Sequence, residues 1–221
     1  MRDSGGPRLT RRSAFIAAAT MGVAMLAGCE DSKFQSIDVS GSSPSLAFTM
    51  TRADDGKEVT QRDYRGKIVM IYFGYTFCTD VCPTTLTNVH DVLSGLGPDA
   101  DHVRVLFVTV DPNRDTLAVL ADYVKNFGPQ VVGLRGTPDQ LAALARRYRV
   151  VQSVEPKTKD HPYEVTHSSA IYVFDGTGAA RLLVPSLDSA SPNIKGTTAD
   201  LKRLIEETNP PGFFTRLFRM A

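Results

Sequence analysis

The stretch that decides the fold is Ile68-Val-Met-Ile-Tyr-Phe-Gly-Tyr-Thr-Phe-Cys-Thr-Asp-Val-Cys-Pro83. Its first six residues form an unbroken apolar run, which is typical of a strand buried on both faces, and the residues after Pro83 favour a helix. Cys78 and Cys82 stand at this strand-to-helix turn, four residues apart, so on the first turns of a helix they point to the same side. The positive end of the helix dipole favours thiolates there. Such a thiol pair can exchange disulfides or hold a soft metal ion.

Strands and helices alternate along the rest of the chain. Asp115 and Thr137 are the expected N-caps of two helices, and Asp175-Gly-Thr-Gly178 is the expected turn of a hairpin. This order predicts an α/β fold, a mixed sheet with helices on both faces, similar to the thioredoxin fold with an N-terminal extension and inserted loops. The predicted strands are 67–74, 103–110, 131–134, 169–174 and 180–184, and the predicted helices are 84–96, 116–127, 138–148 and 198–207.

The first 28 residues are typical of a bacterial export signal. Arg11 and Arg12 precede an uncharged apolar run at 14–28, which is shorter than the roughly 20 residues of a spanning helix but suits a signal peptide. Leu26-Ala-Gly-Cys29 resembles a lipobox, so we expect residues 1–28 to be a lipoprotein signal peptide and Cys29 to carry lipid. An uncleaved anchor is the alternative, and the Sec and twin-arginine routes are both open.

These features divide the chain into four parts. We expect a signal peptide at 1–28, a lipidated tether at 29–45, a folded domain at 46–208 and a C-terminal tail at 209–221. The domain is expected on the periplasmic or extracytoplasmic side of the membrane, an oxidising environment. The leader carries four Arg and one Asp, so without it the net charge changes from +1 to about −2. A weakly acidic surface predicts no nucleic-acid partner.

A histidine is expected to join the two cysteines. The first two predicted strands are parallel, and the carboxyl ends of parallel strands form the usual ligand edge of such a sheet. Cys78 and Cys82 follow one of these ends, and Asp111 follows the other. His167 precedes the predicted strand 169–174, whose amino end reaches the same edge if this strand is antiparallel.

The donor set favours a metal site over a plain dithiol. Thioredoxin-like oxidoreductases usually place a cis-proline before the antiparallel strand, facing a Cys-x-x-Cys pair. Residues 165–170 contain no proline, and Cys78 and Cys82 are spaced Cys-x-x-x-Cys. Two thiolates and the imidazole of His167 suit copper, and zinc can use the same three ligands with a water molecule. Ligand type alone therefore leaves both metals open.

Three motifs extend this interpretation to a family. They are Gly74-Tyr-Thr-Phe-Cys-Thr-Asp-Val-Cys-Pro83, Val110-Asp-Pro-Asn-Arg-Asp-Thr116 and Val165-Thr-His-Ser-Ser-Ala-Ile-Tyr-Val-Phe-Asp175. With these motifs the chain resembles the Sco (SenC) family of copper-binding proteins from about residue 45 to 208. Thr79 is a departure, since the family typically has proline there.

The resemblance implies a membrane-tethered protein that binds copper, as Cu(I) or Cu(II), through Cys78, Cys82 and His167. Asp111 maps to an acidic position of the family, with capping of the following turn as its alternative role. The implied function is that of a copper metallochaperone, a binding protein rather than an enzyme. Its implied partner is the subunit of cytochrome c oxidase that holds the binuclear copper centre, or another copper or thiol protein. Two alternatives are a thiol–disulfide oxidoreductase that reduces the cysteines of a copper acceptor and a copper or redox sensor.

Overall fold

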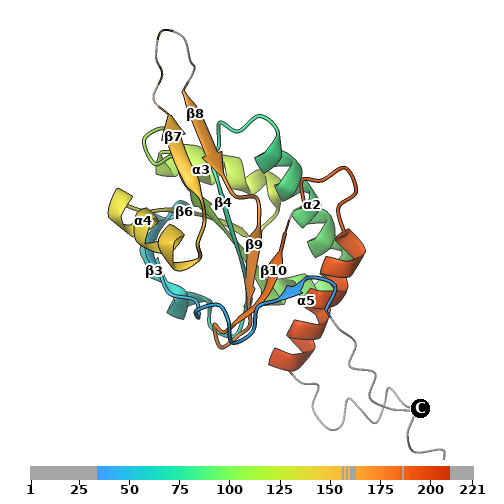
Figure 1. The fold of residues 1–221 in the computed structure, drawn as a ribbon. Coiled ribbons are helices and arrows are strands. Elements are labelled where there is room, and N and C mark those ends of the chain that lie inside the picture. The colour runs from blue at the N-terminus through green and yellow to red at the C-terminus, as the bar shows by residue number, and fades with distance from the viewer. Residues whose placement is uncertain (1–33, 156, 158, 160–162, 186, 210–221) are drawn as a thin grey trace, which may run out of the picture. The chain divides into compact units, whose positions relative to one another are not determined.

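The computed structural model describes residues 34–155, 157, 159, 163–185 and 187–209 (Figure 1). The predicted signal peptide, the predicted lipidation site Cys29 and almost all of the predicted C-terminal tail lie outside these residues. Within the described part of the chain, no helix has the length and apolar character needed to cross a membrane.

One mixed sheet of eight strands, in the order β1-β10-β9-β4-β5-β6-β2-β3, forms the centre of the domain. Strand β4 runs parallel to β5, β5 runs parallel to β6, and β9 pairs with β4 in the antiparallel direction. This arrangement confirms the predicted mixed sheet. The strands are β1 (Ile37–Asp38), β2 (Thr49–Arg52), β3 (Glu58–Thr60), β4 (Ile68–Gly74), β5 (Val103–Thr109), β6 (Val131–Arg135), β9 (Ile171–Phe174) and β10 (Ala180–Val184).

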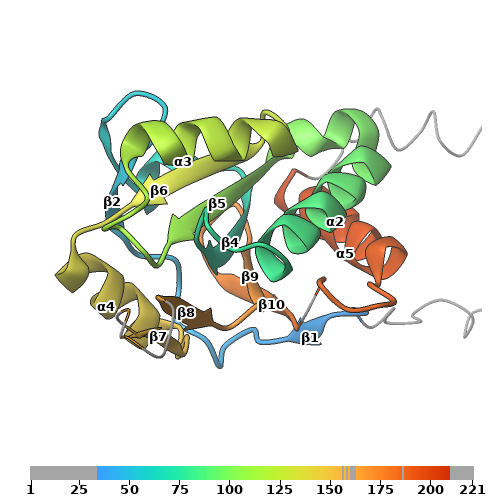
Figure 2. The same ribbon diagram turned by 90° about the horizontal axis from the view of Figure 1, so that it is seen from above.

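Helices cover both faces of the sheet, as Figure 2 shows from above. One face carries α2 (Val81–Leu96), α3 (Leu117–Val124) and α5 (Ile194–Thr208). The other face carries α4 (Pro138–Arg147) and a separate hairpin. The hairpin pairs β7 (Gln152–Glu155) with β8 (Glu164–His167). Three 3₁₀ turns complete the described elements, at Gln61–Tyr64, Gly97–His102 and Lys125–Phe127.

The apolar run of β4 is buried on both faces, as its sequence predicts. Ile68, Met70 and Tyr72 pack into the core beneath α2 and α5, whereas Val69 and Ile71 pack into the core on the α4 side. Burying a side chain of this size contributes about 1.5–3 kcal/mol to folding. The two faces of one strand therefore hold the two halves of the core together.

All five predicted strands and all four predicted helices are present, with shifts at their ends. Helix α2 begins at Val81, three residues before its predicted start, and Thr137 caps α4 by accepting a hydrogen bond from the N–H of Gln140 at 3.2 Å. The predicted cap of α3 is wrong: Thr116, and not Asp115, accepts the hydrogen bond of the Val119 N–H at 3.2 Å. The carboxylate of Asp115 is turned inward, as described below.

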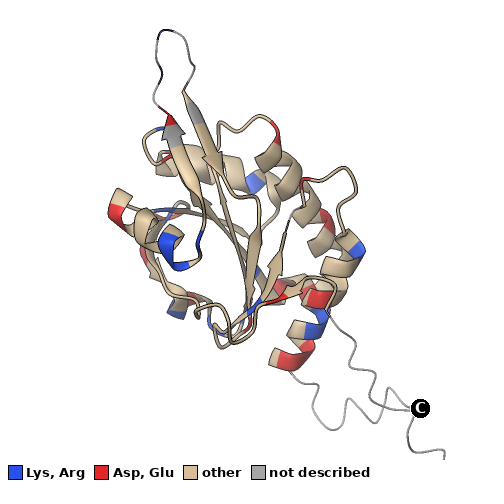
Figure 3. Cartoon of the chain, viewed as in Figure 1, with Lys and Arg blue, Asp and Glu red and all other residues tan. Residues whose placement is uncertain are grey.

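The folded domain begins earlier than the expected residue 46. The N–H groups of Gln35 and Ser36 donate to the buried carboxylate of Asp200 at 2.9 and 2.7 Å. The next two residues form β1 and pair with β10. The ring centroid of Phe34 lies 4.5 Å from the guanidinium of Arg203 in α5, a helix that carries both acidic and basic residues (Figure 3). Residues 34–45 thus belong to the domain and not to a tether, because a carboxylate far along the chain binds their backbone.

Candidate metal centre

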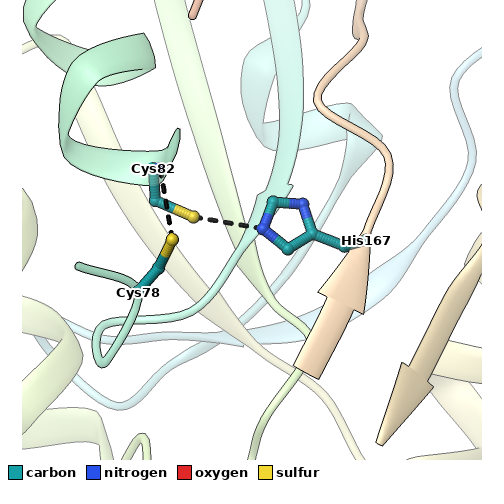
Figure 4. Close-up of side chains that lie close together, drawn as sticks. All are labelled: Cys78, Cys82 and His167. Atoms are coloured by element: carbon teal, nitrogen blue, oxygen red, sulfur yellow. Dashed lines mark hydrogen bonds between the residues drawn. The ribbon is translucent and has the colours of Figure 1, made fainter. Parts of the chain in front are cut away.

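The register of the sheet brings three segments to one edge. Gly74 at the end of β4 pairs with Thr109 at the end of β5, so the segments that follow these parallel strands leave the sheet together. Strand β9 runs in the opposite direction, and the segment before it therefore returns to the same edge. Cys78, Cys82 and His167 meet there, as expected (Figure 4).

The ligand atoms of these three residues form a compact group. The two sulfur atoms and one imidazole nitrogen all lie within 4.8 Å of one another. Cys82 is buried in the first turn of α2, and His167 is the last residue of β8. Cys78 lies in the loop before the helix. Its sulfur nevertheless reaches the group, where it accepts a hydrogen bond from the Cys82 N–H at 3.4 Å.

The backbone fixes the tautomer of His167. Its Nδ1 lies 3.1 Å from the carbonyl oxygen of Ser168, and a carbonyl only accepts, so Nδ1 carries the proton. The unprotonated Nε2 then faces the sulfur of Cys82 at 3.2 Å. A backbone carbonyl on the far nitrogen is the usual way to orient an imidazole that binds a metal.

Burial keeps the Cys82 thiol and the His167 imidazole uncharged when no metal is bound. Desolvation raises the pKa of the Cys82 thiol to about 12 and lowers the pKa of His167. The rings of Tyr72 and Tyr75 are part of the apolar surroundings of His167, with ring centroids 6.0 and 5.8 Å from that of the imidazole. Since a metal must displace the thiol proton, its affinity falls as the pH falls.

Because Gly74 has no side chain, the sulfur of Cys82 can occupy the space beside it. A Cβ at this position would lie 2.9 Å from the sulfur of Cys82 and 2.5 Å from the ring of Phe107. Any larger side chain would therefore displace either α2 or the aromatic core behind it.

Asp115 holds the cysteine loop in place, which the sequence did not predict. Its side chain accepts hydrogen bonds from the Thr76 N–H at 3.0 Å, the Thr76 hydroxyl at 2.6 Å and the Thr109 hydroxyl at 2.5 Å. The residue is fully buried, so these three donors replace water around the charge. This explains why Asp115 does not cap α3.

Asp111 lies near this edge but outside the ligand group. Its buried carboxylate accepts a hydrogen bond from the Tyr163 hydroxyl at 2.9 Å and forms an ion pair with Arg114. Among the described residues, the group that could hold a metal consists of Cys78, Cys82 and His167 alone.

Comparison with known proteins agrees with this arrangement. A family model described as SCO1/SenC matches residues 41–206. The chain belongs to the SCO1/SenC family. Over 125 residues this SCO1/SenC protein is 43% identical to the mitochondrial SCO2 homolog of Bos taurus, a match that covers 56% of the chain and 47% of the relative. The chain thus spans about half the length of the curated relatives it matches.

Solved Sco structures share the fold. The copper-bound structure of ScoI from Bradyrhizobium japonicum has a TM-score of 0.61 and 39% identity, and the match covers 72% of this chain and 98% of that one. The apo Sco1 structure from Thermus thermophilus has a TM-score of 0.67 and 31% identity, covering 78% and 97%. These matches confirm the predicted thioredoxin-like fold of the Sco family.

The different burial of the two thiols predicts different reactivity. In reduced protein at pH 8, limiting iodoacetamide should modify Cys78 at least about tenfold faster than Cys82, because a buried thiol with a pKa of about 12 offers almost no thiolate. Peptide mapping by mass spectrometry measures both rates. In urea the two rates should converge, and equal rates in the folded protein would contradict the described burial of Cys82.

Proposed function

We propose that this protein is a copper metallochaperone, and that Cys78, Cys82 and His167 hold the copper ion as its cargo. The observation that carries the proposal is the convergence of two sulfur atoms and one imidazole nitrogen within 4.8 Å. Soft thiolates suit Cu(I), and the addition of an imidazole suits Cu(II). The Cys82 thiol brings no charge before the metal arrives, so the ion is bound in exchange for its proton, whereas the neutral His167 binds through the free electron pair of Nε2.

The relatives support the choice of copper over zinc. ScoI of Bradyrhizobium japonicum, at 39% identity, was solved with copper bound. We infer from the family that the cargo goes to the binuclear copper centre of cytochrome c oxidase. The half-buried Cys78 supports transfer, because it leaves one side of the site open to an acceptor.

A thiol–disulfide oxidoreductase is the second candidate. It is favoured by the two sulfur atoms, which lie within 4.8 Å of each other, and by the hydrogen bond from the backbone N–H of Cys82 to the sulfur of Cys78. Reduction of an acceptor would oxidise this pair to a 78–82 disulfide, and copper loading would then require its reduction. The two candidates differ on His167, since a dithiol reductase needs no imidazole ligand.

Copper titration of the reduced protein separates these functions. We expect about one copper per molecule, with binding lost in Cys78→Ala and in Cys82→Ala because each removes a thiolate. His167→Ala should lose the sulfur-to-Cu(II) absorption band while the dithiol still oxidises and reduces. His90→Ala is the matched control, since this exposed histidine lies outside the site. Unchanged stoichiometry in the double cysteine variant would sink the chaperone proposal, and an unchanged Cu(II) spectrum in His167→Ala would favour the reductase.

We also propose that residues 1–28 are removed as a signal peptide and that Cys29 is lipidated, facing the extracytoplasmic side. The support is the sequence Leu26-Ala-Gly-Cys29 after a short apolar run. With the domain beginning at residue 34, only a few residues separate this anchor from the fold. Stable attachment requires more than one acyl chain, which lipobox processing supplies.

The Cys29→Ser substitution tests this location. It should either release the domain from the membrane or leave it held by an uncleaved leader of 28 residues, since the acyl acceptor is lost. Membrane fractionation and intact-mass measurement distinguish these results. Wild-type mass together with wild-type membrane association would contradict lipidation of Cys29.

A further inference from the structure

The hairpin that carries His167 has few backbone ties to the rest of the domain. Its strands β7 and β8 form a two-stranded sheet of their own, separate from the main sheet. Figure 1 shows it projecting from the domain, and Figure 4 shows His167 at the end of β8 beside Cys78 and Cys82. A two-stranded hairpin is at best marginally stable alone. The position of His167 therefore depends on side-chain contacts between this hairpin and its surroundings.

Alternate residues of the hairpin make these contacts. Val165 and His167 share one face of β8 because strand side chains alternate, and Tyr163 directly precedes this strand. Val165 is buried in the core on the α4 side, and His167 faces Cys82. Tyr163 is the remaining contact, and it donates its hydroxyl to the buried carboxylate of Asp111 at 2.9 Å.

Arg114 joins this end of the hairpin to the cysteine loop. Its guanidinium lies over the ring of Tyr163, 4.1 Å from the centroid, and over the ring of Phe77, 4.7 Å from the centroid. Phe77 directly precedes Cys78. The same guanidinium forms an ion pair with Asp111, which also binds Tyr163. One cation therefore contacts the segment that carries His167, the segment that carries Cys78, and the carboxylate beneath them.

We propose that Arg114 is a positioning residue, which clamps the hairpin to the cysteine loop and so sets the distance between His167 and the two sulfur atoms. The inference rests on the proposed copper site. A planar guanidinium is suited to this role because it can contact aromatic faces and hold a carboxylate at the same time, whereas the compact ammonium of lysine cannot do both. The buried carboxylate of Asp111 fixes the cation, since an unpaired charge there would be costly.

A second ion pair in the chain provides a matched comparison. Arg52 and Asp55 have the same spacing as Arg114 and Asp111, and the arginine side chains are 30% and 31% exposed. Asp55 is 30% exposed, however, and Asp111 is fully buried. In the described part of the chain Arg52 makes no cation–π contact, so this pair has the same charges without the aromatic contacts that Arg114 makes.

Hydrogen exchange of the reduced, metal-free protein tests the clamp directly. Arg114→Gln should speed exchange in residues 152–155 and 164–167 by roughly tenfold, because the hairpin opens more often once the cation is lost. Arg52→Gln should leave these residues at the wild-type rate. Tyr163→Phe, which removes only the hydroxyl bond to Asp111, should give a smaller increase. If Arg114→Gln does not fold, Arg114→Lys keeps the charge and should still speed exchange in the hairpin.

Copper spectra provide a readout that general destabilisation would not change. Arg114→Gln should weaken the sulfur-to-Cu(II) band, which His167→Ala loses, while one Cu(I) still binds to the two thiolates. Wild-type hairpin exchange or a wild-type Cu(II) band in Arg114→Gln, or in Arg114→Lys if the first variant does not fold, would overturn the clamp. If the wild-type protein binds no copper, the proposed function fails, and the exchange rates of the metal-free variants alone decide the clamp.

Discussion

The buried carboxylate of Asp115 is the interaction on which the site depends. It accepts three hydrogen bonds, two from Thr76 and one from Thr109, and thereby ties the segment after β4 to the end of β5. Arg135 in β6 supports the segment after β5, because it donates hydrogen bonds to the carbonyl oxygens of Asp115 at 3.1 Å and Pro112 at 2.8 Å. A charge in the protein interior is tolerated only when its hydrogen bonds are satisfied. The hydrogen bonds that satisfy the carboxylate of Asp115 therefore fix the backbone at Thr76, two residues before Cys78.

The chemistry of the site follows from what surrounds these anchored segments. Burial raises the pKa of Cys82 and lowers that of His167, so both side chains are uncharged when no metal is bound. The carbonyl of Ser168 holds the proton of His167 on Nδ1 and leaves Nε2 toward the sulfur. The three side chains that would hold the metal are thus in place beforehand, and a bound ion would replace a proton instead of reorganising the fold. The more open Cys78 offers the route by which the ion can arrive and leave.

The central part of this arrangement could be predicted from the sequence because it depends on short-range patterns. The unbroken apolar run of β4 identified the central strand, and the direction of β9 placed His167 at the cysteine edge. Asp115 was misinterpreted because an acidic residue just before a helix also suits a cap, and its true partner Thr76 lies 39 residues away. Such a contact leaves no local signal.

The same limit explains the error at the domain boundary and the hairpin that was not predicted. Gln35 and Ser36 are held by Asp200, which lies 165 residues beyond Gln35, and the next two residues pair with β10. Neither partner is visible locally, so the polar composition of this segment resembled a tether. The strands of the hairpin are only four residues each, too short for a clear alternation of apolar and polar residues. What keeps them in place is contact with Arg114 and the core, which only the folded chain brings together.

The central claim is that one copper ion is held by Cys78, Cys82 and His167 together. X-ray absorption spectroscopy of the Cu(II)-loaded protein tests it most directly, because the first coordination shell reports sulfur and imidazole ligands separately. The wild-type protein should show two sulfur ligands and one imidazole per copper. The imidazole contribution should be lost in His167→Ala, whose Cu(I)-loaded form should retain both sulfur ligands. A shell without sulfur, or an imidazole signal that persists in His167→Ala, would contradict it.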